Sequence, residues 1–219
     1  MELSELHRKF EEHLAEQKKS WKSFIYSQKM GFYQGFDKLN VQGCRPTEER
    51  FKRYGIKNFL SKEKTALDIG CNCGFFSLFI SDFLKSIDGI EINPFLVAIA
   101  NDAKKFLNIT NAFFQDTSFE DFNTDKKYDI IFSLANDSTI DGNTKFNFFE
   151  YISKIINLIK PAGLLIFESQ APDSFRPERF KPKLEHLKKY FDILVEKKVL
   201  SNYPYNVKER FFLVLRKKD

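Results

Sequence analysis

Carboxylate side chains stand at the ends of several apolar runs of the sequence, and the first of these runs leads into a glycine-containing turn. Asp68 lies in this run, and Gly70 and Gly74 follow it in LDIGCNCG, so the backbone can turn tightly and approach a ligand. Glu91 ends a second run and Asp116 a third. Such carboxylates can accept hydrogen bonds from an ammonium group, from both hydroxyls of a ribose and from an adenine amino group, respectively. The pattern therefore predicts a ligand site at these run ends.

Two more acidic residues follow later apolar runs and are candidates for a general base. Asp137 comes after YDIIFSLAN, and Glu168 ends GLLIFE. A base matters only when the acceptor is a poorly acidic hydroxyl or amine. An Asx turn would explain Asp137 equally well, and a buried ion pair with an arginine would explain Glu168. Arg45 and Arg176 lie in loops that contain Gly or Pro; they are candidates for bidentate binding of a phosphate-like group, with a solvated surface as the alternative.

Strand-like runs alternate with helical runs from residue 65 onward, and these elements must position the polar residues. Such alternation predicts a mostly parallel sheet with helices on both faces. The last two strands have no helix between them, so they must form an antiparallel pair. We therefore expect an α/β fold of seven strands with an antiparallel C-terminal edge strand. The expected strands are 65–69, 87–92, 110–115, 128–135, 163–169, 192–200 and 209–217, and the expected helices are 1–30, 47–60, 74–85, 93–107, 144–160 and 177–191.

The residues before this alternation have a different pattern. An amphipathic helical stretch is followed by GFYQGFDKLNVQGCRP, which reads as a loop that crosses a pocket. We therefore divide the chain into an N-terminal helical lid, residues 1–61, which would choose the substrate, and a ligand-binding domain, residues 62–219. Tyr33 and Gln34 lie in the loop and are candidates for substrate contact, although packing of the aromatic residues on the N-terminal helix is an equal alternative.

Composition excludes several classes of protein. The 219 residues, 42% hydrophobic and 30% charged, predict a globular chain. No apolar run approaches the roughly 18 residues that span a membrane, and the N-terminus lacks an apolar signal segment, so we expect a cytoplasmic protein without a membrane span. Three cysteines are too few for a disulfide framework or a zinc site, so we expect no metal. The net charge of +5 suits an anionic ligand or RNA, and equally a solvated lysine-rich surface.

Five motifs, LDIGCNCG, IDGIEINP, FFQDTS, YDIIFSLAND and IKPAGLLIFES, resemble in order and spacing those of class I methyltransferases that use S-adenosylmethionine. The resemblance covers residues 62–217 and implies a Rossmann-like sheet, with S-adenosylhomocysteine as a product. It implies binding of the methionine part after the first strand, the ribose after the second, adenine after the third and the sulfonium side at the fourth. The cofactor-binding residues that it implies are Asp68, Gly70, Cys71, Asn72, Gly74, Phe75, Glu91, Ile92, Asp116, Thr117, Ser133 and Leu134.

Two other nucleotide-binding classes fit the sequence less well. A nicotinamide dehydrogenase would show Gly-x-Gly-x-x-Gly after the first strand, whereas this chain has Gly-x-x-x-Gly and no pyrophosphate cradle. A P-loop NTPase is excluded because the turn lacks the lysine that contacts the phosphates.

Closer resemblances concern the acceptor. Asn72 in GCNCG, together with FYQGFDKLNVQGCRPTEERFKRY, resembles tRNA wobble-uridine carboxymethyl transferases, RNA enzymes that methylate a terminal phosphate, and bacterial methyltransferases of capsular saccharides. Such relatives often carry a His after the fourth strand, where this chain has Asn136 and Asp137. We expect methyl transfer to an oxygen of a hydroxyl, phosphate or phosphoramidate on a small or saccharide-linked, anionic acceptor, as in bacterial surface-polysaccharide modification. RNA modification, with an ordinary or a carboxylated cofactor, is the alternative; the oligomeric state stays open.

Overall fold

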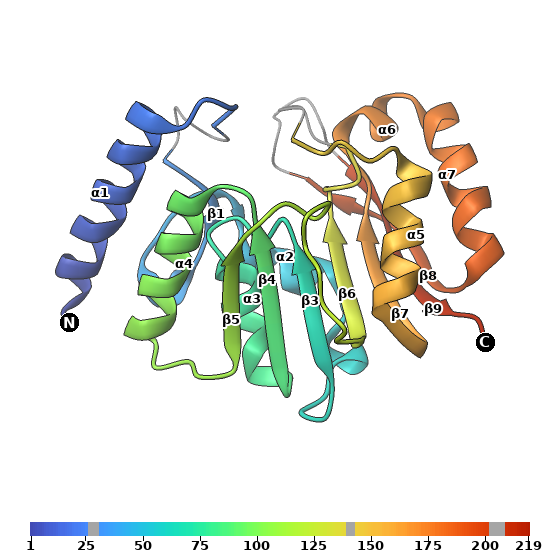
Figure 1. The fold of residues 1–219 in the computed structure, drawn as a ribbon, viewed down its shortest axis with the longest axis horizontal. Helices are drawn as coiled ribbons and strands as arrows, with labels where there is room; N and C mark the ends of the chain where they lie inside the picture. Colours follow the sequence, from blue (N-terminus) through green and yellow to red (C-terminus); the bar gives the residue numbers. More distant parts are fainter. Residues whose placement is uncertain (26–30, 139–142, 202–208) are drawn as a thin grey trace.

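Seven strands form the main sheet of the computed structural model, which describes residues 1–25, 31–138, 143–201 and 209–219. The strands are β3 (Thr65–Ile69), β4 (Ser86–Glu91), β5 (Ala112–Asp116), β6 (Tyr128–Leu134), β7 (Ile159–Glu168), β8 (Phe191–Leu200) and β9 (Glu209–Lys217). Their order is β5-β4-β3-β6-β7-β9-β8 (Figure 1). The first five in this order pair in parallel, and β9 runs antiparallel to both β7 and β8.

This arrangement confirms the predicted α/β class and the antiparallel pair at the C-terminus. The reversed strand β9 lies between β7 and β8, so β8 is the edge strand. Strand β7 begins at Ile159, earlier than expected, where the backbone is already extended. Residues at the carboxyl ends face one another across the sheet: Ile69 pairs with Ser133, and Leu134 with Glu168.

Helices cover both faces of the sheet, as alternation along the strands requires (Figure 1). Ala66 and Ile130 join a core cluster with α3, whereas Leu67 and Ile131 face the opposite cluster with α5 and α7. The helices are α1 (Leu3–Ser20), α2 (Thr47–Tyr54), α3 (Phe75–Ile80), α4 (Pro94–Phe106), α5 (Phe148–Leu158), α6 (Ala171–Phe175) and α7 (Pro177–Tyr190).

Helix ends follow local sequence signals. The side chain of Asn93 caps α4 and Pro94 occupies its first turn, while Asn147 and Glu150 form a capping box that starts α5 later than expected. Helix α2 is shorter than predicted because Gly55 ends it in the left-handed conformation, with φ of +62°. The helix expected over 1–30 ends at Ser20, and its last residues, 26–30, lie outside the described residues.

The segment between α1 and β3 contributes a second, small sheet. Strands β1 (Phe32–Gly35) and β2 (Gly43–Pro46) pair in parallel where the sequence predicted a loop. Gly43 permits this approach, because a Cβ there would lie 2.4 Å from backbone atoms of β1. Leu6 and Phe10 of α1 belong to the core cluster against which Phe32 of β1 packs. Within the described residues, no helix is long and apolar enough to cross a membrane.

Candidate active site

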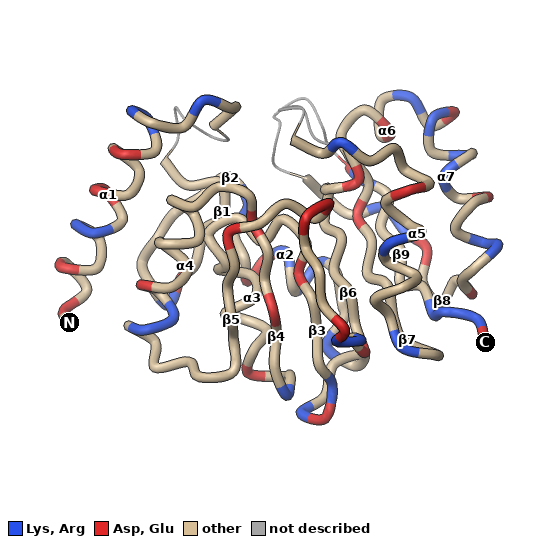
Figure 2. The backbone as a smooth tube through the Cα atoms, viewed as in Figure 1, with Lys and Arg blue, Asp and Glu red and all other residues tan. Residues whose placement is uncertain are grey.

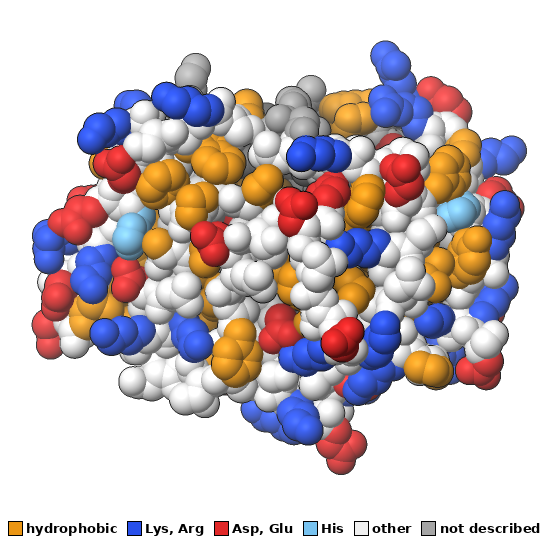
Figure 3. Space-filling view, in the orientation of Figure 1, with side chains coloured by type: hydrophobic (Ala, Val, Ile, Leu, Met, Phe, Trp, Pro, Cys, Tyr) orange, Lys and Arg blue, Asp and Glu red, His pale blue; other side chains and the backbone are white. Residues whose placement is uncertain are grey.

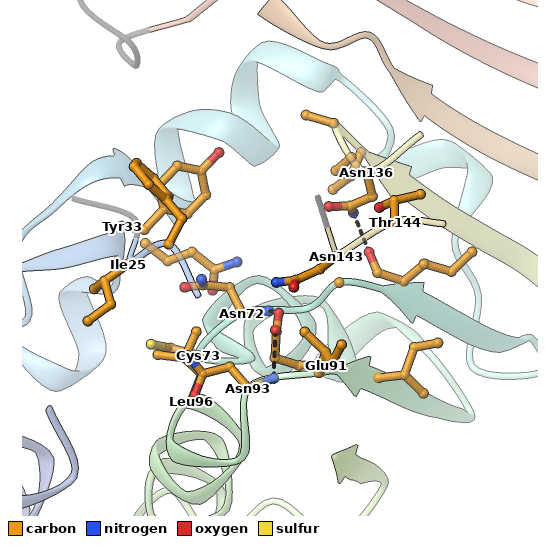
Figure 4. A pocket seen from close by; sticks show the side chains of 18 of the residues that line it. Ile25, Tyr33, Asn72, Cys73, Glu91, Asn93, Leu96, Asn136, Asn143 and Thr144 are labelled. Atoms are coloured by element: carbon orange, nitrogen blue, oxygen red, sulfur yellow. Dashed lines mark hydrogen bonds between the residues drawn. The ribbon is translucent and has the colours of Figure 1, made fainter. Parts of the chain in front are cut away.

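A cavity of about 650 Å³ lies at the carboxyl ends of the parallel strands, where the sequence predicted a ligand site. Its walls come from the segments after β3, β4 and β6 and from the N-terminal region. Glu91 and Asn93 lie on one side of the cavity, with Tyr33 across from them and Asn136 on a third side (Figure 4). The lining thus joins strand-end polar groups to aromatic side chains of the first 61 residues.

The turn after β3 depends on residues that accept a left-handed backbone. Gly70 has φ of +63°, and a Cβ there would lie 2.7 Å from Oδ1 of Asn136. Asn72 has φ of +56°, a conformation that Asn tolerates better than most residues other than Gly. This backbone requirement favours Gly or Asn at position 72.

Gln34 of β1 holds this turn in place. Its Nε2 donates to the Cys71 carbonyl at 3.1 Å, and its Oε1 accepts from the Phe75 N–H at 3.0 Å. The buried side chain, predicted as a substrate contact, therefore braces the turn while also lining the cavity. Cys71, Gly74 and Phe75, predicted as cofactor contacts, are not part of the cavity lining. A Cβ on Gly74 would instead meet the side chain of Phe114 at 2.6 Å.

Glu91 carries its carboxylate into the cavity from the end of β4 (Figure 4). Its Oε2 accepts from the Asn72 N–H and its Oε1 from the Asn93 N–H, each at 3.0 Å. These two bonds fix the carboxylate before any ligand binds. Ile92 and Thr117 line the cavity, whereas Asp116, predicted to face adenine, is exposed and outside the lining.

Asp68 and Asn72 bring buried polar atoms to the cavity. The Asp68 carboxylate accepts from Ser77 Oγ at 2.5 Å, and burial raises the pKa of Asp68 to about 6, against the opposing effects of Ser77 and Arg50. The Oδ1 atom of Asn72 is buried without a hydrogen-bond partner. A buried acceptor without a hydrogen bond lowers the stability of the folded chain, and a ligand donor that binds it would remove this cost. The pair suits a cationic donor such as an ammonium group.

The end of β6 supplies a wall of the cavity. Leu134 and Asn136 line it, and the Asn136 amide donates to the Ile69 carbonyl. Ser133 is fully buried and does not line the cavity. Its hydroxyl oxygen lies 2.9 Å from the hydroxyl oxygen of Tyr151.

Neither of the two predicted general bases is among the residues that line the cavity, and each is held by a buried ion pair. Asp137 accepts from Lys183 Nζ at 2.5 Å, and burial raises the pKa of Asp137 to about 6. Glu168 is fully buried and accepts from Arg45 at 2.6 Å. Despite burial, the surrounding arginines lower the pKa of Glu168 to about 2. The ion pair considered for Glu168 is therefore present, and neither carboxylate lines the described cavity.

The arginines at the cavity differ from those that the sequence singled out. Arg45 is buried, donates hydrogen bonds to Tyr33 and Glu168, and does not line the cavity. Arg176 is exposed to solvent and does not line the cavity either. Arg50 and Arg210 line the cavity instead. The sequence did not single out Arg50 as it did Arg45 and Arg176. Its spacing with Thr47 and Tyr54, at three and four residues, was the missed signal of one buried helix face; nothing in the sequence marks Arg210.

Comparison with known proteins identifies the fold's family. Residues 60–210, more than half of the chain, match the family described as "Methyltransferase domain". The chain belongs to this family. It is a class I S-adenosylmethionine-dependent methyltransferase, as its motifs predicted.

Individual relatives of the methyltransferase act on different acceptors. A protein of Methanocaldococcus jannaschii named "Putative protein N5-glutamine methyltransferase" is 27% identical over 172 residues, which cover 67% of this chain and 85% of that protein. The N-methyltransferase NodS of Bradyrhizobium japonicum, in complex with S-adenosylhomocysteine, has a TM-score of 0.64 at 15% identity and covers 83% of this chain and 91% of its own. A tRNA methyltransferase of M. jannaschii has a TM-score of 0.56 at 16% identity. The match covers 77% of this chain and 49% of that protein's chain.

S-Adenosylmethionine is the cofactor of the methyltransferase, and the cavity suits it. The unpartnered oxygen of Asn72 and the carboxylate of Asp68 match the ammonium of its methionine part. The fixed carboxylate of Glu91 suits ribose hydroxyls, and the cavity beside Thr117 and Phe119 suits adenine. Sequence reasoning did not single out Phe119, whose ring lines this end of the cavity.

Proposed function

We propose that the methyltransferase transfers a methyl group to an oxygen of a small or saccharide-linked acceptor, as in the modification of bacterial surface polysaccharides. Of the oxygen acceptors that the sequence leaves open, we favour phosphate, phosphoramidate or another oxygen that is already deprotonated at neutral pH. Such an oxygen attacks without a general base.

The carboxylates of the cavity carry this proposal. Among the described lining residues, Asp68 is bound to Ser77, Glu91 accepts from two backbone N–H groups, and Glu120 accepts from the N–H groups of residues 145 and 146. The described lining contains no histidine. A hydroxyl acceptor would need a base that these groups are poorly placed to supply, whereas an anionic oxygen would not.

The chain's contribution to the reaction is then chiefly one of position. S-Adenosylmethionine supplies a methyl group on a sulfonium, an excellent leaving group for in-line displacement. Holding two reactants in line removes much of the entropic barrier. Glu91 and the turn braced by Gln34 would fix the cofactor side, while Leu134 and Asn136 would bound the space in which the acceptor oxygen approaches.

The N-terminal segment would provide acceptor contacts, consistent with its proposed role as a substrate-choosing lid over residues 1–61. Trp21, Phe24 and Phe175 all line the cavity. Rings of this kind offer broad, rigid contact area to a bulky acceptor. These rings and the cavity volume of about 650 Å³ support an acceptor larger than a bare ion.

Calorimetry and a turnover assay test the proposal together. We expect S-adenosylhomocysteine to bind, and Glu91→Ala to weaken binding at least about tenfold, which corresponds to about 1.4 kcal/mol. Glu63→Ala is the matched control, because it removes an exposed carboxylate far from the lining. Turnover should be highest with phosphorylated saccharides in a panel that also holds neutral glycosides, a glutamine-containing peptide and tRNA. Preference for the neutral glycosides, the peptide or tRNA would overturn the proposal.

A further inference from the structure

Three guanidinium groups lie around the carboxylate of Glu168, and two of them, those of Arg50 and Arg210, belong to residues that line the cavity. Arg45, Arg50 and Arg210 are 2%, 5% and 3% exposed, and Glu168 is fully buried. Arg45 lies 2.6 Å and Arg210 3.3 Å from Oε1 of Glu168, and the Tyr54 hydroxyl donates to its Oε2. Among the described residues, Glu168 and Asp68 are the carboxylates that interact with these arginines, so two acidic groups face three positive charges. Buried charge without a counter-charge is costly, which makes the cluster receptive to an anion.

Arg50 has donor capacity that the protein leaves unused. Its Nε donates to the Tyr54 hydroxyl at 3.1 Å, but its Nη1 is buried with no hydrogen-bond partner. The guanidinium is held over the rings of Phe76 and Tyr54, 5.2 and 5.6 Å from their centroids. Arg50 also lines the cavity, so the residue that carries this unsatisfied donor borders the site.

The place of the cluster in the sheet relates it to the acceptor. Glu91, suited to the ribose, ends β4, whereas Glu168 ends β7 and Arg210 lies on β9. In the strand order, β3 and β6 separate β4 from β7 and β9. The arginine cluster therefore lies on the half of the sheet away from the proposed ribose position. Tyr33, which lines the cavity nearby, responds to the same field: despite burial, Arg45, Arg210 and Arg50 lower the pKa of its phenol.

We propose that Arg50, flanked by Arg210, binds an anionic oxygen group of the acceptor, a phosphate or a carboxylate. Guanidinium groups bind such oxygens with short, charge-assisted hydrogen bonds. The anion would satisfy the Nη1 donor of Arg50 and balance the excess charge of the cluster. This inference rests on the proposed function, because it takes the same cavity to hold an acceptor beside the cofactor.

The test uses the protein saturated with S-adenosylhomocysteine and inorganic phosphate as the probe, followed by calorimetry. We expect phosphate to bind the parent protein and Arg50→Gln to weaken that binding at least tenfold, while S-adenosylhomocysteine affinity changes less than threefold. Arg53→Gln is the matched control: it removes the same charge from the same helix, but its guanidinium pairs with Glu49 at 2.7 Å outside the cavity. Should Arg50→Gln not fold, Arg50→Lys must still weaken phosphate binding at least threefold.

Each contrary outcome has a separate meaning. If S-adenosylhomocysteine does not bind the parent protein, the proposed function fails. If it binds and phosphate does not, or if both Arg50 variants bind phosphate like the parent, the anion site is refuted while the proposed function stands. If Arg50→Gln weakens S-adenosylhomocysteine but not 5′-methylthioadenosine, which lacks the amino-acid part, Arg50 holds the cofactor's own carboxylate and the assignment to the acceptor is overturned.

Discussion

Single residues of the cavity carry polar groups in states that are unfavourable without a ligand. Asp68 is a buried carboxylate, Asn72 has an unpartnered oxygen, and Arg50 has an unpartnered donor. Each group costs folding free energy in the ligand-free chain and would recover part of it in a complex. The cavity is therefore organised for binding at some cost in stability, and this cost can be measured.

The pH dependence of stability should show this cost at Asp68. Its folded pKa of about 6 exceeds the roughly 3.9 of an unfolded aspartate, so the folded chain binds this proton more tightly. That stabilisation is fully present below about pH 4 and is lost as the pH rises through 6. We expect Asp68→Asn to raise the free energy of unfolding by about 1–3 kcal/mol at pH 8, and less at pH 4.5, in urea denaturation. The same variant should bind S-adenosylhomocysteine more weakly.

Asp129→Asn is the control of opposite sign. Despite partial burial, hydrogen bonds from Lys160 and Thr65 lower the pKa of Asp129, so its stabilisation is present at neutral pH and lost on acidification. Removing it should lower stability at pH 8. An Asp68→Asn protein that follows the pH profile of the parent would contradict the burial argument.

The sequence predicted some of the cavity but not its arginines. Asp68, Gly70 and Glu91 are recognisable because the ends of parallel strands converge, whatever the details of packing. Arg50 and Arg210 come from α2 and β9, far apart in the chain, and their burial depends on how these two elements pack. Periodicity and local charge carry no information about such a contact.

Among the elements, helix and strand types were predictable and their ends less so. The seven strands lie where apolar runs predicted them, and some shifts of element ends have a local cause, such as Gly55 after α2. The pairing of β1 with β2 was missed because each has only four residues and the segment is rich in Gly. The segment shows neither clear alternation nor a helical period.

Three elements meet at one ion cluster that the sequence did not predict. Lys183 of α7 contacts Asp137, just after β6, at 2.5 Å and Asp173 of α6 at 2.7 Å. Both carboxylates are almost fully buried. The single ammonium therefore joins the cavity wall after β6 to the two helices behind it.

Lys183→Met should remove the stabilisation that these ion pairs give to the packing of the three elements. It leaves two buried carboxylates without their cation, so we expect a loss of about 3–5 kcal/mol in the free energy of unfolding at pH 7. Lys188→Met, on the same helix and paired with Glu185 at the surface, should cost less than about 0.5 kcal/mol. Chemical denaturation of the three proteins measures both values. Equal stability of the two variants would show that the cluster does not join the elements.

For the whole molecule, the distribution of charge bears on the acceptor more than the net charge does. The net charge is +5, and Figures 2 and 3 show Lys and Arg interleaved with Asp and Glu on the visible face, without a continuous basic stripe there. The cluster of positive charge beside the cavity is instead buried, and it consists of Arg45, Arg50 and Arg210. A small anion can reach an internal cluster at the cavity, whereas an RNA backbone needs an extended basic surface.

RNA binding should accordingly be weak and only mildly dependent on salt. With about two phosphate contacts, affinity for tRNA should fall about tenfold between 50 and 200 mM salt, compared with a thousandfold or more for a protein that makes six to ten contacts. Filter binding with tRNA, in the presence of S-adenosylhomocysteine, measures the slope, and Arg50→Gln should leave it unchanged because Arg50 is buried. A steep slope that surface Lys→Gln variants reduce would instead favour the RNA-modifying alternative, since only an exposed basic surface would then account for the affinity.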